Sequence, residues 1–245
     1  MMEVPLKTLL DDNFAPLTYQ AGFLETKLEN AMEVFLKWQL EIGAPFGRYP
    51  HHESFIATLP QALARLEPLT TPPTKVLLIE THSRWTAFFD NGLRASDPES
   101  PVGHLCTIIP CKGVVIHCAP DRNQGRATQA LRVYGIVSFR MFVPHQTEWL
   151  NQERAIIAMN DGGSWLFSAD GVAQSFEELG SYAARRIVDR FTDDMLERYC
   201  KALDIAFFDE DFYGKKGAVI NTVQKLAIES PVMSLEEVRF ANRRG

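Results

Sequence analysis

The residues best suited to chemistry lie in the middle of the chain. His104, His117 and Cys118, together with Asp90 and Asp97, offer two imidazoles, a thiol and two carboxyl groups. A thiol nucleophile needs a nearby base, and that base needs a third group to orient it. His117 and Cys118 are adjacent, so on one regular strand they would point to opposite faces. An enzyme that acts on a small molecule at the rim of a sheet is therefore the secondary hypothesis.

Sequence motifs typical of metal, nucleotide and hydrolase sites are missing. The chain has no HExxH, CxxC, GxxxxGK[ST], GxGxxG or GxSxG pattern. His51, His52 and Glu53 are adjacent, but three adjacent side chains on a loop seldom reach one ion. Gly162-Gly163 is expected between two strands, where it forms a turn rather than a phosphate-binding loop. We expect no metal site and no cofactor.

An acidic and aromatic segment near the C-terminus favours a protein partner. Residues 207–213 mix aromatic side chains with Asp209, Glu210 and Asp211, a combination that forms hot spots against basic surfaces. The alternative is a loop packed over the core with its acids in solvent. Acids in turns, such as Asp90 and Asp97, often bond to backbone amides instead. The residues expected to contact a partner are Asp90, Asn91, Asp97, Asp209, Glu210, Asp211 and Tyr213.

Composition indicates a folded protein with a large core. Of the 245 residues, 46% are hydrophobic and 23% are charged, with a net charge of -6. The cations are scattered, which argues against a nucleic-acid surface. No window approaches the roughly 18 apolar residues of a membrane span, and the N-terminus lacks the apolar run of an export signal. With four cysteines expected to be free, we predict a cytoplasmic protein.

The elements that must position these residues follow a segregated order. We predict helices at 27–42, with Thr26 and Glu29 as a capping box, and at 59–66, after an irregular to extended start over 1–24. Paired strands are expected within 75–92, and a short helix at about 101–109. Strands follow at 113–118 and 131–143, with a bulge at Gly135. A hairpin joins 153–159 to 164–168, followed by a turn at 169–171.

The last third is predicted to be mainly helical. Helices are expected over 176–190, after Thr192 as N-cap, and from Ser234. Residues 204–218 read as a packed loop, with weak strands at 218–223 and 225–228. The chain is therefore predicted to be α+β, a single domain over 1–245 that is helical over 1–70, sheet-forming over 75–170 and helical over 176–245. Its central sheet would be mainly antiparallel and flanked by helices from the N- and C-terminal thirds.

Parts of the chain resemble a family of uncharacterised bacterial proteins. The resemblance covers roughly residues 75–215 and is carried by RWTAFFDNG at 84–92, GGSWLF at 162–167 and RRIVDRFT at 185–192. This family is loosely similar to the immunity proteins of polymorphic toxin systems, and the resemblance implies no catalytic residues. The leading hypothesis is thus a bacterial protein that binds a basic protein such as a toxin, without catalytic activity. The sequence leaves the oligomeric state open.

Overall fold

A nine-stranded sheet forms the centre of the computed structural model, which describes residues 6–121 and 133–243. Its order is β2-β10-β4-β5-β1-β6-β7-β8-β9, and neighbouring strands are antiparallel throughout. The strands are β1 (Gln20–Leu24), β2 (His51–Ile56), β4 (Lys75–Thr81), β5 (Thr86–Asp90), β6 (Gly113–Ala119), β7 (Ile136–Phe142), β8 (Gln152–Asn160), β9 (Trp165–Gly171) and β10 (Tyr213–Asn221). A separate pair joins β3 (Leu69–Thr70) to β11 (Val232–Met233). The predicted α+β class with a mainly antiparallel sheet is confirmed.

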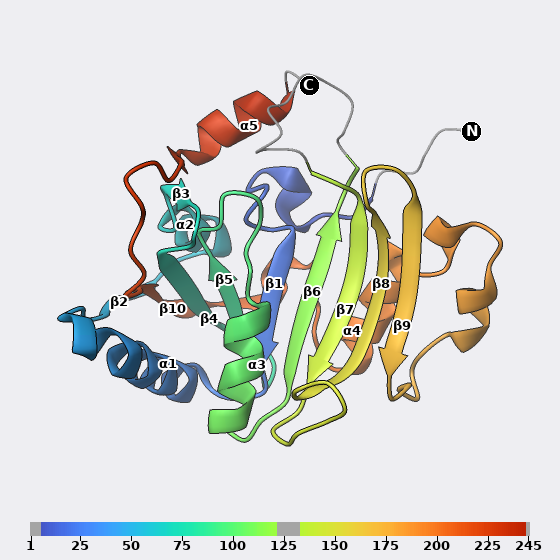
Figure 1. The fold of residues 1–245 in the computed structure, drawn as a ribbon, viewed down its shortest axis with the longest axis horizontal. Coiled ribbons are helices and arrows are strands. Elements are labelled where there is room, and N and C mark those ends of the chain that lie inside the picture. The colour runs from blue at the N-terminus through green and yellow to red at the C-terminus, as the bar shows by residue number, and fades with distance from the viewer. Residues whose placement is uncertain (1–5, 122–132, 244–245) are drawn as a thin grey trace.

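Helices cover both faces of the sheet, but they cover one face only in part. The α-helices are α1 (Leu28–Gly43), α2 (Leu59–Ala64), α3 (Glu99–Ile108), α4 (Asp193–Ala202) and α5 (Leu235–Arg243), and the 3-10 helices are η1 (Leu9–Asp12), η2 (Ala44–Phe46), η4 (Leu179–Ala183), η5 (Ile187–Asp189) and η6 (Glu210–Phe212). In Figure 1, α1 and α3 lie in front of the sheet and α4 lies behind it. No described helix stands in front of β7, β8 and β9 (Figure 1).

Alternation along each strand sends side chains into two separate cores. The front core packs Leu24, Phe88 and Val115 of the sheet against α1 and α3. The larger back core includes Phe23 and Phe139 and is covered by α4 and the chain that follows it. Because successive residues on a strand point to opposite faces, these assignments also identify which polar side chains face the front.

Two predicted hairpins are present. β4 pairs with β5, with Leu77 opposite Phe89, and lies inside the sheet as expected. β8 pairs with β9 around the turn at 161–164, in which the Asp161 carboxylate accepts from the amides of Gly163 and Ser164. Gly162 adopts a φ of 94°, a conformation that favours glycine.

The strand that joins the two halves of the sheet is one that the sequence pattern misses. β1 lies in the stretch predicted to be irregular to extended, with no strand of the sheet placed there, yet it pairs with β5 on one side and β6 on the other. All five of its residues are buried, so it shows none of the alternation that reveals a half-exposed strand. Gly22 stands where β1 crosses beneath α3, and an added Cβ there would lie 2.6 Å from Val102 Cγ2.

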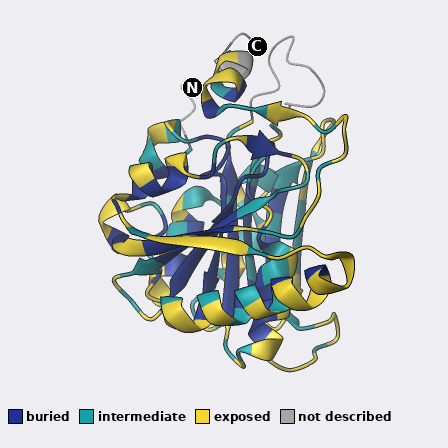
Figure 2. Ribbon diagram, turned by 90° about the vertical axis from the view of Figure 1, so that its left-hand side faces the viewer, coloured by how far each residue is buried: buried dark blue, intermediate teal, exposed yellow. Residues whose placement is uncertain are grey.

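The far edge of the sheet also differs from prediction. β2 occupies part of the region 43–55, which was expected to be a loop, and it is exposed along almost its whole length (Figure 2). β10 begins at Tyr213, within the predicted loop 204–218, and residues 225–228 form no strand. β1, β2 and β10 all come from the outer thirds of the chain, so long-range pairing rather than local pattern forms this half of the sheet.

Three local predictions are wrong. Residues 176–190 form 3-10 turns instead of an α-helix, because Glu177 is drawn into a buried ion pair with Arg154. Residues 169–171, predicted to form a turn, are instead the last residues of β9. The bulge between β7 and β8 lies opposite Met141/Phe142, where Glu153 of β8 is the extra residue, and Gly135 precedes β7.

Helix ends follow the sequence signals unevenly. Thr192 caps α4 by accepting a hydrogen bond from the Met195 amide, as predicted. The capping box expected at Thr26 is absent: the N-cap of α1 is Lys27, and the Thr26 hydroxyl accepts from the Asn30 side chain instead. α5 begins at Leu235, directly after the predicted start.

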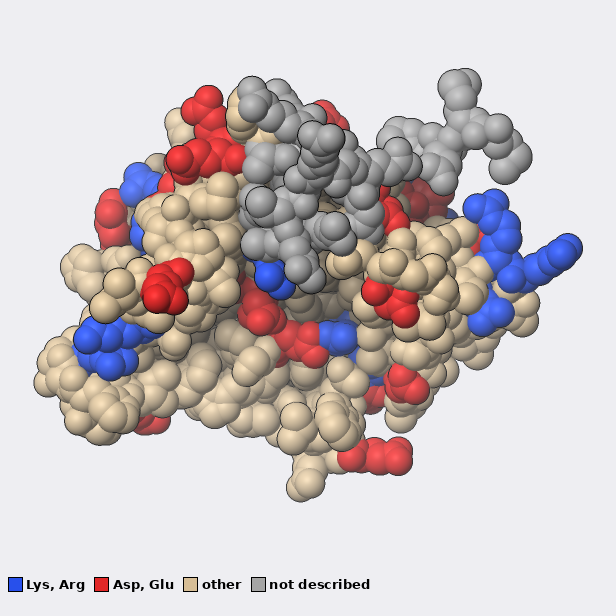
Figure 3. Space-filling view, turned by 45° about the horizontal axis from the view of Figure 1, so that its top comes forward, with Lys and Arg blue, Asp and Glu red and all other residues tan. Residues whose placement is uncertain are grey.

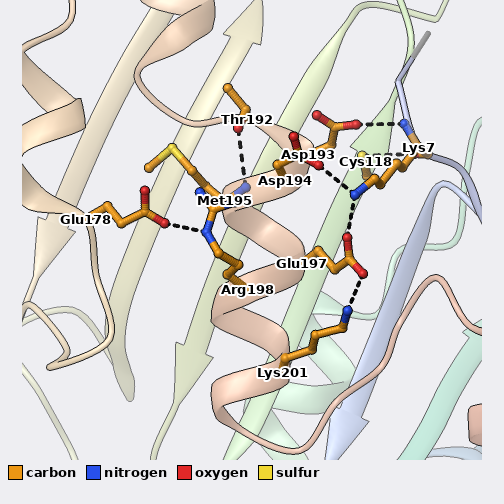
Figure 4. A network of polar contacts seen from close by, with 10 residues as sticks. All are labelled: Lys7, Cys118, Glu178, Thr192, Asp193, Asp194, Met195, Glu197, Arg198 and Lys201. Atoms are coloured by element: carbon orange, nitrogen blue, oxygen red, sulfur yellow. Dashed lines mark hydrogen bonds and ion pairs between the residues drawn. The ribbon is translucent and has the colours of Figure 1, made fainter. Parts of the chain in front are cut away.

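A charged network holds the N-terminal segment against α4 (Figure 4). The ammonium of Lys7 lies 2.6 Å from an Asp194 oxygen and 2.5 Å from a Glu197 oxygen, and the Lys7 amide donates to Asp193. Glu197 also pairs with Lys201 one turn further on. These charges satisfy one another, so the network is best explained as a tether between distant parts of the chain.

Candidate functional site

Three polar side chains stand in line across the front face of the sheet. His117 on β6 lies opposite Gln20 on β1 and opposite Ser138 on β7, and all three belong to the face on which α3 packs. We call Gln20, His117 and Ser138 the polar row. Gln20 and Ser138 are 8% and 3% exposed, while His117 is partly exposed, so the row opens to solvent at its centre.

The polar row is unusual because its hydrogen-bonding groups are unused. Within the described part of the chain, no hydrogen bond involves these three side chains, and none of their polar atoms is among the fully buried atoms that lack a partner, so they reach solvent. Polar groups near the surface are normally paired with protein or water, so these groups are available to water or to a ligand. Burial lowers the pKa of His117 to about 4, and the imidazole is therefore neutral at pH 7, with one nitrogen that donates and one that accepts.

Charged residues border the polar row on the side of α3. Arg140, two residues beyond Ser138 on β7, forms an ion pair with Glu99 in the first turn of α3. Burial lowers the pKa of Arg140, whereas the negative charge of Asp97 opposes that change. In Figure 3, acidic and basic side chains gather in a hollow at the centre of the front face.

A groove continues from this charged border along α3. It has a volume of about 640 Å³ and runs between α3 and the loop that connects β7 to β8. The residues that line it are Asp97, Glu99, Ser100, Gly103, His104, Thr107, Phe142, Gln146, Trp149, Leu150, Asn151 and Gln152. We call this the α3 groove. Trp149 and Leu150 are 70% and 75% exposed, so its outer lip offers apolar surface.

Asp90 and Asn91 lie inside the protein, which removes them from the surface expected to contact a partner. The two Asp90 carboxylate oxygens accept hydrogen bonds from the amides of Gly92 and Asp97, each at 2.8 Å. Asn91 accepts from the amides of residues 74 and 75 and donates to the carbonyl of Pro68. Both side chains therefore shape the turn after β5. Burial raises the pKa of Asp90 to about 7, although its amide partners oppose the shift.

The histidines and the cysteine of the secondary hypothesis do not meet. His117 belongs to the polar row, but Cys118 points into the back core, where its thiol lies 3.5 Å from the Lys7 carbonyl oxygen. His104 is exposed in the α3 groove and packs against Trp38, with ring centroids 4.6 Å apart and ring planes tilted by 44°. Asp97 is the other predicted residue that lines the α3 groove.

The acidic segment near the C-terminus splits between surface and core. Asp209, Glu210 and Asp211 are exposed as expected. The aromatic anchors are not, since Phe207 is 1% exposed and Tyr213 donates its hydroxyl hydrogen to the Phe207 carbonyl. This removes Tyr213 from the predicted partner surface and leaves the three acids without an exposed aromatic anchor in this segment.

Sequence reasoning missed most of the polar row. Gln20 lies in a segment without strand periodicity, and Ser138 is one hydroxyl within an apolar strand. Only the register of three strands brings these residues to His117. Alternation within 136–142 placed Ser138 and Arg140 on one face, which is the sole signal the sequence contains.

The described residues contain no group of three or more His, Cys, Asp or Glu side chains suited to hold a metal ion. Among the same residues, none of the helices has both the length and the apolar character needed to cross a bilayer. Comparison with family models, with curated proteins and with solved structures found no match to this chain.

Proposed function

We propose that this protein binds a small, uncharged molecule over the polar row. The observation that supports the proposal is the row itself: Gln20, His117 and Ser138 stand in register without a hydrogen-bond partner among the described residues. Ligand sites typically combine apolar walls with a few convergent polar groups. The α3 groove, which Glu99 and Phe142 line, is the nearest described hollow, although no residue of the row lines it.

The charge state of the row selects the ligand chemistry. An amide, a hydroxyl and a neutral imidazole offer both donors and acceptors but no net charge. The neighbouring Arg140 is already paired with Glu99, so an ionic ligand would have to displace that contact or enter without a counter-ion. Removing an ion from water without a partner is costly. Uncharged molecules with several polar atoms, such as nucleosides or sugars, fit this pattern best.

Binding is better supported than nucleophilic catalysis. Ser138 on β7 lies directly opposite His117 on the neighbouring strand β6, an arrangement that could place a hydroxyl nucleophile beside a base. A base works best when its pKa is near the operating pH, however, and burial holds the pKa of His117 at about 4. The imidazole would remove a hydroxyl proton poorly, so we propose a binding role for this pair.

Ligand-observed NMR with a panel of nucleosides and monosaccharides tests the proposal. We expect at least one probe to show saturation transfer from the wild-type protein, and we expect Ser138→Ala and Gln20→Leu to weaken it about tenfold, the effect of about 1.4 kcal/mol. Ser175→Ala, at an exposed position outside the α3 groove, is the matched control and should leave binding unchanged. If no probe binds, or if both row variants bind the probe as tightly as the wild type does, the row holds only water.

A second candidate function, protein binding, is favoured by the exposed end of the sheet. β2 is an edge strand, and Ile56, Phe46 and Tyr49 near it are 77%, 71% and 68% exposed. An unpaired edge beside apolar side chains can pair with another chain. The toxin-neutralising role implied by the family resemblance would use the acids at 209–211 instead.

Co-expression with the product of the neighbouring gene separates these two surfaces. Ile56→Lys should abolish co-purification if the edge strand is the contact. Asp209→Asn combined with Asp211→Asn should abolish it if a basic partner meets the acids. No co-purification with the wild-type chain would count against both.

A further inference from the structure

Two cysteines are brought together where α3 ends. The backbone amide of Cys111 donates to the carbonyl of Cys106 at 3.2 Å, which closes a turn after the last residues of the helix. Both side chains belong to the front core, where Cys106 is buried and Cys111 packs against the same cluster. The Cys106 sulfur also packs against Gly113 at the start of β6, where an added Cβ would be 2.4 Å from it. The pair is therefore held between α3 and the sheet.

The two thiols differ in access. Cys106 is fully buried in the front core, whereas Cys111 is partly exposed. A reagent from solvent therefore reaches Cys111 first, and Cys106 is placed directly behind it. Cys118 and Cys200 are buried in the back core and provide internal controls.

The proximity of the thiols shifts their pKa values in opposite directions. Donation from the Cys106 thiol lowers the pKa of Cys111, and the amide of Glu25 adds to this effect. The same interaction, with burial, raises the pKa of Cys106. Because the thiolate is the nucleophile, Cys111 is the member of the pair that attacks.

From this arrangement we infer that Cys106 and Cys111 form a redox-active dithiol that a small-molecule disulfide such as oxidised glutathione converts to an intramolecular disulfide. This inference goes beyond the proposed binding function and does not depend on it. The Cys111 thiolate attacks one sulfur of the reagent, forms a mixed disulfide and releases one glutathione thiolate. Cys106 then loses its proton and attacks the Cys111 sulfur, which expels the second glutathione. The protein is oxidised by two electrons and loses two hydrogens, and one oxidised glutathione becomes two reduced ones.

The test uses the native full-length chain, oxidised glutathione and intact-mass spectrometry. We expect the wild-type protein to lose the mass of two hydrogens, to keep no glutathione adduct, and to yield a peptide in which Cys106 and Cys111 are linked. Dithiothreitol should reverse the change. The buried thiols of Cys118 and Cys200 should stay reduced in the same sample.

Two variants assign the roles. Cys106→Ser should stop the reaction at a lasting adduct on Cys111, and Cys111→Ser should leave the protein unmodified. If Cys106→Ser does not fold, the wild-type and Cys111→Ser samples still decide the question. Unchanged thiols in the wild type, a stable wild-type adduct, or the same oxidation in Cys111→Ser would overturn the inference.

Discussion

Arg154 and Glu177 form an ion pair that is closed off from solvent. Their side chains are 4% and 0% exposed. The guanidinium donates two hydrogen bonds to the carboxylate, from Nε to Oε1 at 2.8 Å and from Nη2 to Oε2 at 2.5 Å. The Tyr182 hydroxyl and the Gln174 amide donate to the same carboxylate. The pair fastens residues 172–190 to β8, because these contacts replace the water that both charges lose on burial.

Removing one partner of this ion pair should be strongly destabilising. Glu177→Ala leaves a buried guanidinium without its counter-ion, so we expect a loss of about 3–5 kcal/mol in the free energy of unfolding. Chemical denaturation monitored by tryptophan fluorescence measures this. The neighbouring Glu178 pairs with Arg198 at the surface, and Glu178→Ala should cost at most about 1 kcal/mol. Equal losses for the two variants would contradict the assigned burial.

Gly22 should tolerate no side chain, because α3 rests on it. A methyl group there would meet Val102 Cγ2 at 2.6 Å and Pro98 Cβ at 2.9 Å. We expect Gly22→Ala to destabilise by about 1–3 kcal/mol, and the double variant with Val102→Ala to show positive coupling, measured by a double-mutant cycle. Gly180→Ala is the matched control, since nothing lies within 4 Å of its added Cβ. An unaffected Gly22→Ala would show that α3 can shift at no cost.

Asp90 and His117 should act on stability in opposite directions over the same range of pH. The folded-state pKa of Asp90 is about 7 against an ordinary 3.8, so its contribution is present at low pH and is lost as pH rises towards 7. The folded-state pKa of His117 is about 4 against an ordinary 6.5, so its contribution is present above pH 6.5 and is lost as pH falls towards 4. Between about pH 4 and 6.5 the two effects offset each other.

Single variants should reveal the hidden pH dependence. With His117→Asn, stability should rise on acidification from pH 6.5 to 4, because Asp90 remains. With Asp90→Asn, stability should fall over the same range, because His117 remains. Urea unfolding at a series of pH values measures both slopes. Glu148→Gln, at an exposed position, should keep the wild-type profile, and parallel profiles for all four proteins would refute the assignment.

The Lys7 network should contribute little to stability despite its short contacts. The hydrogen bonds from Lys7 to Asp194 and Glu197 raise the pKa of the ammonium, but the side chain is 43% exposed and solvent screens the pair. We expect Lys7→Met to cost less than about 1 kcal/mol, and the cost to shrink in high salt. Thermal unfolding at low and high ionic strength tests this. A loss that is several times larger and insensitive to salt would indicate that the tether is buried.

The sequence alone determined the elements whose signals are local. The hairpins around 75–92 and 153–168 follow from apolar runs and turn residues, and α4 follows from the Thr192 cap and its apolar stripe. A turn or a cap involves residues only a few positions apart, so its physical cause is contained in the pattern. The α+β class was also predicted, although the segregated order behind that prediction is broken by β1, β2 and β10 in the outer thirds.

Tertiary structure decided the strands and the site that depend on distant partners. β1 is a strand because β5 and β6 offer their edges to it, and its five buried residues show no alternation that a local pattern could reveal. The polar row exists only because the registers of β1, β6 and β7 bring Gln20, His117 and Ser138 into line. Pairing across the chain sets that alignment, and a shift of one residue would turn each side chain to the opposite face.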